Sequence, residues 1–414
     1  MHSERIKDSQ LLLLSTLLIS SLTFANPATA APKTAAPKTS TTKSVTLKKL
    51  DPLVSTPLAE GVVASGKTLI TYSNTGGTNS NILITGFDAN GLQLWQRTID
   101  SGADEIALAA TVDSAGTLWL AGDSAPITPV ETATVPLPAD NPDGVVAEAP
   151  IKLRADMNLL TLWKISSAGE LLATYSLAQA APALINGISV NTSGISIIGQ
   201  LEEKPFLISV SSTGTFGKVT TLGTSKTQLN AVVRNSDGTV NVFGTSSETL
   251  ASKKNVGIRD GVLIKVSKVG TIMNVVRSSA PKADRAWLSA DNTLALTGYV
   301  KTGKIIETAF TKFTTTFAPT WTLRIPSAGD SQVLTTGAIT YGALSSNAEI
   351  KGVSGWRPTT PQLAVLGFNS KGVITSAYGF PALTTPMALT YSKDLGLYGL
   401  AKTADGSISL FKIA

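Results

Sequence analysis

The sequence has no cysteine, and its one histidine is His2, at the very start of the chain. Without thiols the fold cannot contain disulfides and must be held together by packing. Beyond position 2 the chain cannot form Ser-His-Asp or Cys-His nucleophilic sites, nor bind zinc, haem or iron–sulfur clusters through those side chains. Any catalysis would have to use carboxylates, Lys, Arg, Tyr or a cation bound through oxygen. Phosphate-binding and nucleophile-elbow motifs are absent as well.

Charged side chains are few, at 15% of the residues, and the positive excess is concentrated near one end. Residues 31–50 hold five lysines and no acid, whereas residues 51–414 hold 27 Lys and Arg against 26 Asp and Glu. A body so close to neutral lacks the electrostatic field with which proteins attract nucleic acids. We therefore expect no nucleic-acid partner.

The first 30 residues have the pattern of a secretory signal peptide. Leu11–Phe24 is an apolar segment that follows Arg5 and Lys7, and Ala28-Thr-Ala30 fits the small-residue cleavage pattern. The apolar segment is short for a membrane span, so we favour cleavage after Ala30 over an uncleaved anchor. We therefore expect a secreted protein, in the periplasm, at the cell surface or outside the cell, with no transmembrane segment in the mature chain.

Residues 31–43 read APKTAAPKTSTTK, with too few large apolar side chains to fold alone. We interpret this Ala/Pro/Lys/Thr-rich tract as a solvated linker, the alternative being contact of its lysines with an anionic polymer or lipid. The predicted organisation is a signal peptide over 1–30, a linker over 31–43 and one folded domain over 44–414. An insert over 123–157 interrupts the second repeat of that domain.

The folded domain repeats a unit of short strands joined by small-polar-Gly corners. The clearest copy is Ala107–Gly122 (ALAATVDSAGTLWLAG), whose strand ends on a glycine. Such glycines either adopt positive φ or leave room where neighbouring sheets crowd together. A periodic array of this kind predicts a β-propeller. The units begin near Glu60, Ile106, Leu184, Leu229, Arg285, Leu334 and Met387.

Seven units predict a seven-bladed propeller whose last blade is incomplete. From Met387 onward there is sequence for only three strands, whereas Thr46–Val63 resembles an outer strand leading into an inner one. We expect this N-terminal outer strand to complete the last blade and close the ring, with Val45–Leu50 paired to Ser407–Ile413. Closure of this kind removes exposed sheet edges.

Two segments carry a resemblance to known repeats. They are Phe87–Trp95 (FDANGLQLW) and Val112–Gly122 (VDSAGTLWLAG), which resemble the seven-bladed propeller repeat of secreted bacterial proteins, the SBBP-like family. They are also similar, more weakly, to quinoprotein-type propeller repeats. The resemblance implies the fold and a setting outside the cytoplasm, and it assigns no catalytic residue.

Irregular sequence is predicted to gather on one face of the propeller. Loops between the two middle strands of a blade share a face with the connections between blades, and surface loops on a rigid scaffold commonly carry binding sites. We therefore expect the ligand on this loop-rich face. The predicted inserts there are Ser73–Asn81, Asp123–Met157, Thr245–Gly261, Tyr299–Ile306 and Gly352–Pro361.

Six residues on that face are candidates for ligand binding. An exposed Trp356 next to Arg357 would stack on a sugar or aromatic ring and pair with a carboxylate, the alternative being a tryptophan that caps a blade. Near the blade entries, the other candidates are Glu105, Arg259, Arg285 and Asp330. For the blade-entry charges, bonds to neighbouring backbone or ordinary surface ion pairs are the favoured alternative.

Three further side chains, Asn186, Asn230 and Thr335, are expected to line the central channel. The predicted function is a secreted, non-catalytic binding or interaction module that works as a monomer without a cofactor. Its ligand would be a glycan, a cell-wall polymer or a protein. Two alternatives stay open: a propeller enzyme, either carbohydrate-active with paired carboxylates or quinoprotein-like with calcium, and a structural surface or adhesion component.

Overall fold

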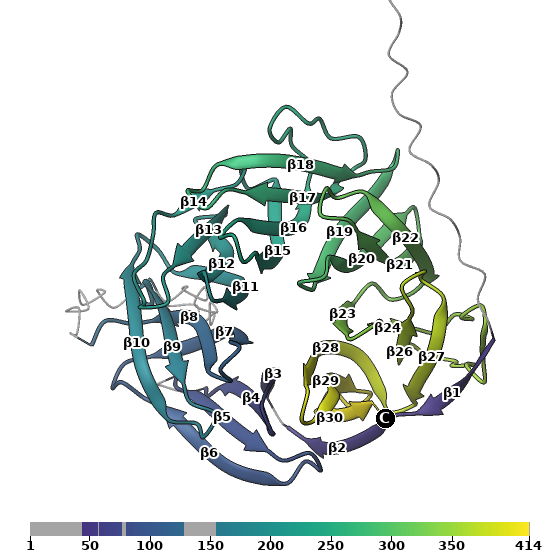
Figure 1. Cartoon of the computed structure of the whole chain (residues 1–414), viewed down its shortest axis with the longest axis horizontal. Helices are drawn as coiled ribbons and strands as arrows, with labels where there is room; N and C mark the ends of the chain where they lie inside the picture. The colour runs from purple at the N-terminus through teal and green to yellow at the C-terminus, as the bar shows by residue number, and fades with distance from the viewer. Residues whose placement is uncertain (1–43, 57, 77–79, 128–154, 414) are drawn as a thin grey trace, which may run out of the picture. The chain divides into compact units, whose positions relative to one another are not determined.

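The computed structural model describes residues 44–56, 58–76, 80–127 and 155–413, all within one compact unit that spans 37–414. The described residues form thirty β-strands, and no helix able to cross a membrane occurs among them. The strands make six four-stranded sheets and one six-stranded sheet, which surround a common centre (Figure 1). The chain is therefore an all-β propeller. The predicted signal peptide, the linker and most of the 123–157 insert lie outside the described residues.

Within each four-stranded sheet, neighbouring strands are hydrogen-bonded in order from the centre outward. The innermost strands are β3 (Ala59–Ser65), β7 (Glu105–Val112), β11 (Ala183–Asn191), β15 (Thr227–Arg234), β19 (Ala283–Ala290), β23 (Ser331–Thr336) and β28 (Leu383–Ser392). The second strands are β4 (Thr68–Asn74), β8 (Leu118–Ser124), β12 (Gly194–Leu201), β16 (Val240–Ser246), β20 (Ala295–Thr302), β24 (Ile339–Ser346) and β29 (Gly396–Thr403). Each predicted unit start falls within an innermost strand.

The third strands are β5 (Ile82–Phe87), β9 (Leu159–Ile165), β13 (Lys204–Val210), β17 (Asp260–Val266), β21 (Ile305–Phe313), β26 (Gln362–Phe368) and β30 (Ile408–Ile413). The fourth strands are β6 (Gln93–Ile99), β10 (Leu171–Ala178), β14 (Thr220–Thr221), β18 (Ile272–Ser278), β22 (Pro319–Pro326), β27 (Ile374–Phe380) and β2 (Asp51–Ser55). The six-stranded sheet also contains β1 (Val45–Lys49) and β25 (Val353–Ser354).

Burial follows the position of each strand in its sheet. The second strand β8 (LWLAGDS) is buried along its whole length, whereas the outer strand β10 (LLATYSLA) alternates between exposed and half-buried side chains. Hydrophobic clusters lie between neighbouring sheets, as in the one that joins Trp119 of β8 to Ile195 of β12. The core is thus a series of sheet-to-sheet interfaces, which explains the near-continuous apolar runs of the middle strands. Trp163 and Trp287 are both buried in such clusters.

The N-terminal strands divide between two sheets, which corrects the predicted pairing. β2 runs antiparallel to β30, from Asp51 opposite Lys412 to Ser55 opposite Ser409. β1 instead runs parallel to β27 and β25 of the preceding sheet, so the expected pairing of Val45–Leu50 with Ser407–Ile413 is wrong (Figure 1). The reason is hydrophobic: Val45 and Leu47 pack against the apolar cluster of that sheet.

One predicted insert is not a loop. β20 and β21 continue as a hairpin through Tyr299 and Ile306 and turn at Gly303, whose φ of +60° suits a residue without a side chain. Residues 352–361 do form an irregular segment, which includes the short strand β25. The segment between β16 and β17 also leaves its sheet, as predicted.

Candidate functional site

Six of the innermost strands carry a β-bulge at the same point. Each bulge lies where the register between the first and second strands shifts by one residue. An inserted residue bends its strand and redirects its own side chain. All six inserted residues line one central cavity: Glu60, Leu108, Asn186, Asn230, Leu288 and Met387.

At four of the six bulges a glycine in the second strand leaves room for the bulged strand, whereas Ser73 and Ala401 occupy the corresponding place at the bulges of Glu60 and Met387. A Cβ at Gly122 would overlap the carbonyl oxygen of Ile106, two residues before Leu108, and Gly199 meets the Leu184 oxygen in the same way. Gly244 and Gly298 repeat the arrangement, and positive φ is found at none of these four glycines. Of the two roles predicted for the repeated strand-ending glycine, the spatial one applies. The crowding comes from the bulge of the same sheet rather than from the neighbouring sheet.

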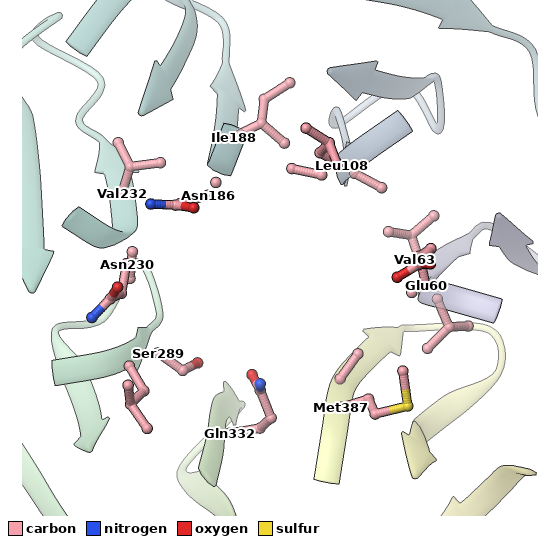
Figure 2. A pocket seen from close by; sticks show the side chains of 18 of the residues that line it. Glu60, Val63, Leu108, Asn186, Ile188, Asn230, Val232, Ser289, Gln332 and Met387 are labelled. Carbon is pink, nitrogen blue, oxygen red and sulfur yellow. The ribbon is translucent and has the colours of Figure 1, made fainter. Parts of the chain in front are cut away.

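The cavity has a volume of about 380 Å³ and is lined by both polar and apolar side chains. In Figure 2, Asn230, Ser289 and Gln332 follow one another along the rim, and Val232 lies between Asn230 and Asn186. Across the cavity from Asn230, Glu60 lies beside Val63 and Met387. The propeller therefore presents hydrogen-bonding groups and hydrocarbon to one central space.

The two asparagines link neighbouring innermost strands. Asn186 Nδ2 donates to the Leu229 carbonyl at 2.8 Å, and Asn230 Nδ2 donates to the Trp287 carbonyl at 2.8 Å. Leu229 and Trp287 are the residues immediately before a bulge. Because a carbonyl only accepts hydrogen bonds, each amide must turn its nitrogen to the next strand. In the part of the chain that the structure describes, no group donates to Oδ1 of Asn186 or Asn230, so each offers a free acceptor.

Ionisable groups are rare around the cavity. Glu60 is exposed to the cavity, and it is the one acidic or basic side chain among the described lining residues. Burial, and after it the charge of Glu60, raises the pKa of the Tyr72 phenol, which therefore stays neutral. Across the described ranges, no three His, Cys, Asp or Glu side chains gather where they could hold a metal ion. The lining supplies acceptors and apolar surface but no pair of carboxylates for acid–base chemistry.

The six residues predicted as a site lie elsewhere. None of them lines the central cavity. Arg259 and Arg285 share a junction, where the Arg285 amide donates to the Arg259 carbonyl at 3.0 Å. Arg259 forms a two-point ion pair with Asp284, at 2.9 and 2.6 Å, and its Nη2 also donates to the Tyr299 hydroxyl at 2.9 Å.

The guanidinium of Arg285 lies over the ring of Trp287, 4.5 Å from the ring centre. Burial, and after it the charge of Arg324, lowers the pKa of Arg285 to about 10. Glu105 is buried, and one of its oxygens accepts the Ser101 amide at 2.8 Å. Burial also raises the pKa of Glu105. Both residues serve the packing of blade entries.

The expectation of an exposed Trp356 is wrong. The residue is 4% exposed, and its Nε1 donates to the Ala348 carbonyl at 2.9 Å. Its ring packs in the apolar cluster that also receives Leu47 of β1, so it caps the six-stranded sheet. Arg357 and Asp330 are exposed, and Arg357 borders hollows on both sides of its loop, with volumes of about 250 and 380 Å³.

Some of the residues that line the cavity were predicted from the sequence. The prediction that Asn186 and Asn230 line the channel is confirmed. Thr335 does not line it, because its hydroxyl accepts the Thr293 hydroxyl at 3.0 Å and pairs with Thr340 at 3.0 Å. Glu60 was recognised as the start of a repeat but not as a lining residue. The signal was available, since it occupies the same place in its repeat as Asn186 does.

Comparison with known proteins yields structural likeness only. No family model and no curated protein matches the chain, so its resemblance to the SBBP-like repeat stays a prediction. The WD40 domain of Toxoplasma gondii coronin is 10% identical over 90% of this chain and 88% of that one, with a TM-score of 0.49. A putative 6-phosphogluconolactonase from Bacteroides uniformis ATCC 8492 is 11% identical over 85% and 93% of the two chains, also at 0.49.

The β-propeller domain of the Trilobed protease from Pyrococcus furiosus is 9% identical over 87% of this chain and 95% of that chain, with a TM-score of 0.47. Likeness at these levels does not extend to activity or partners.

Proposed function

We propose that this protein is a non-catalytic binding module whose ligand enters the central cavity. The observation that supports this is the convergence of six bulge residues from separate sheets on one space lined by polar and apolar side chains. A concave site with a few placed polar groups on apolar walls is typical of ligand binding. The loop-rich face is a weaker candidate than at the sequence level, because Trp356 is buried.

The enzyme alternatives lack support in the same lining. A carbohydrate-active site would need a second carboxylate beside Glu60, and a quinoprotein-like site would need a dense set of acids and cations. The described lining has Glu60 as its one charged side chain. Binding without turnover is therefore the function that the cavity favours.

A variant that fills the cavity tests this proposal. Leu108→Trp enlarges a half-buried side chain that projects into open space, so we expect ligand capture to be lost while thermal stability changes little. Leu172→Trp is the matched control, because Leu172 is 53% exposed on the outer strand β10. Binding is measured by calorimetry against panels of small amines, glycans and wall-polymer fragments. Capture that survives Leu108→Trp would place the site elsewhere, with the hollows beside Arg357 next to be tested.

We also propose that the sheets form a seven-bladed ring, six blades of four strands and one enlarged to six, which β2 closes. The pairing of β2 with β30 supports closure. A crystal structure with six or eight sheets around the axis would contradict this count.

Finally, we propose that the protein is exported and cleaved after Ala30. This rests on the apolar segment and the Ala-Thr-Ala pattern of the sequence. The intact mass of protein recovered outside the cytoplasm measures it, and a mass that retains residues 1–30 would refute cleavage. Export would present the cavity to small molecules, glycans, wall polymers or proteins, and a cavity of about 380 Å³ admits only one small group of a polymer or protein.

A further inference from the structure

We propose that the central cavity binds a primary alkylammonium group, carried on a straight hydrocarbon chain. This inference rests on the proposed binding function and adds the chemical class of the ligand. It follows from three properties of the described lining: the free acceptor oxygens, the sign of the charge, and the apolar side chains that lie near Glu60 (Figure 2).

The free acceptor oxygens come from the asparagine links. Asn186 and Asn230 each donate one amide hydrogen, to the carbonyls of Leu229 and Trp287, both at 2.8 Å, and their Oδ1 atoms accept no hydrogen bond within the described part of the chain. Ser289 Oγ accepts the Val333 amide at 3.3 Å and keeps its own hydrogen, and Gln332 carries one acceptor and two donors. The lining therefore holds donors as well as acceptors, and a ligand with N–H donors would satisfy the two free oxygens.

The charge of Glu60 and the apolar side chains of the lining are the second and third properties. Glu60 gives the lining one negative charge, with no lysine or arginine among the described lining residues to balance it. An ammonium group supplies both the positive charge and three N–H donors. Its methylene chain would cover Val63, Leu108, Ile188 and Met387, gaining about 0.8 kcal/mol for each CH₂ removed from water. A sugar would carry no positive charge to pair with Glu60.

Two sources present this group: a free polyamine, or the lysine side chain of a partner protein. The test measures binding to the purified protein by calorimetry at low and physiological salt. Putrescine and spermidine represent free polyamines, and a lysine residue blocked at both its amino and carboxyl ends represents the side chain. Butanediol is the uncharged match for putrescine. We expect the amines to bind and butanediol to fail. Tighter binding of blocked lysine than of putrescine would assign a protein source, and the reverse a free polyamine.

Single substitutions test whether Glu60 and Asn186 contribute to amine binding. Glu60→Gln keeps the shape and removes the charge, so we expect amine affinity to fall about tenfold, the usual range for one charged hydrogen bond in a binding site. Glu170→Gln, on an exposed turn, is the matched control and should change nothing. Asn186→Ala should weaken binding as well. Asn74→Ala loses a similar link, the 2.9 Å bond to the Ala107 carbonyl, at a position outside the cavity lining, and should leave affinity unchanged.

Several results would overturn the inference. Equal binding of putrescine and butanediol, or unchanged amine affinity in Glu60→Gln, would show that charge plays no part. If a neutral glycan binds and Leu108→Trp blocks it, the alkylammonium class is wrong while the proposed binding function stands. If no panel member binds, or if binding persists in Leu108→Trp, the central cavity is not the site and both proposals fail.

Discussion

At the scale of single residues, several side-chain amides and acids in this protein bond to the backbone of a neighbouring sheet. Asn74, Asn186 and Asn230 each donate to a carbonyl of the next innermost strand. Asp123 does the converse, accepting the Ala183 amide at 2.9 Å. A buried backbone group without a partner is costly, so these bonds explain why polar residues recur at strand ends in an apolar repeat.

Substitutions of Arg259 and Arg285, which share a junction, should change the free energy of unfolding in opposite directions. Arg285 is half-buried, stacks on Trp287 and has no carboxylate partner among the described residues, so Arg285→Met should raise the free energy of unfolding by up to about 1 kcal/mol. Arg259→Met breaks the two-point pair with Asp284 and should lower it by about 1 kcal/mol. Urea unfolding of both variants measures the difference. Destabilisation of similar size in both would mean that the stacking of Arg285 outweighs its desolvation.

Asp123 should make the free energy of unfolding depend on pH. Burial raises the pKa of its carboxyl from 3.8 to about 7. Between these values the folded protein binds more protons than the unfolded chain, so the contribution of Asp123 to the free energy of unfolding is full at low pH and decreases as the pH rises towards 7. Asp123→Asn keeps an oxygen for the Ala183 amide and should flatten this part of the stability profile. Urea titrations at a series of pH values give the slope, and an unchanged slope in the variant would assign it to other groups.

At the scale of elements, four of the six bulges in the first strands are matched by a glycine in the second strand. At these four a carbonyl of the bulged strand folds onto the second strand, and the glycine leaves room for it, as at Gly122 and Gly298. The same bulge turns a side chain toward the centre. At these four positions the repeated glycine and the cavity lining therefore have one cause.

Gly122→Ala should be strongly destabilising. The added methyl group would overlap the Ile106 carbonyl oxygen, which is backbone and cannot swing aside, so we expect a loss of about 3 kcal/mol or more. Gly76→Ala is the matched control, because nothing lies within 4 Å of its added Cβ. Thermal and urea unfolding give the comparison. Near-wild-type stability of Gly122→Ala would require that the bulge at Leu108 can relax, and would remove the steric explanation for the glycine.

At the scale of the whole molecule, stability depends on strands that join the two ends of the domain. β2 completes the sheet that ends the chain, while β1 extends the sheet before it, so adjacent residues act in different places. Leu50, between the two strands, is fully buried in the cluster that contains Phe411 and Tyr378. Consecutive sheets are thereby connected through the N-terminal segment.

Truncating the chain at two different residues separates the contributions of β1 and β2 to stability. A chain that starts at Leu50 loses β1 alone and exposes the edge of β27, which remains paired on its other side to β26. A chain that starts at Thr56 also loses β2 and leaves β30, and with it the end of the ring, without an outer neighbour. We expect a clearly lower melting temperature and aggregation for the second chain, and a smaller change for the first. Equal melting temperatures of the two truncated chains would show that β2 is not needed for closure.

The sequence by itself determined the strands, their order and the all-β class, because alternation, corners and glycines depend on residues close together in the chain. It also determined that Asn186 and Asn230 face the channel. Only the tertiary structure decided where β1 pairs, that Trp356 is buried, and that Glu60 shares a cavity with the two asparagines. Each of these depends on contacts between sheets formed by residues far apart in sequence, whose energies no local pattern records.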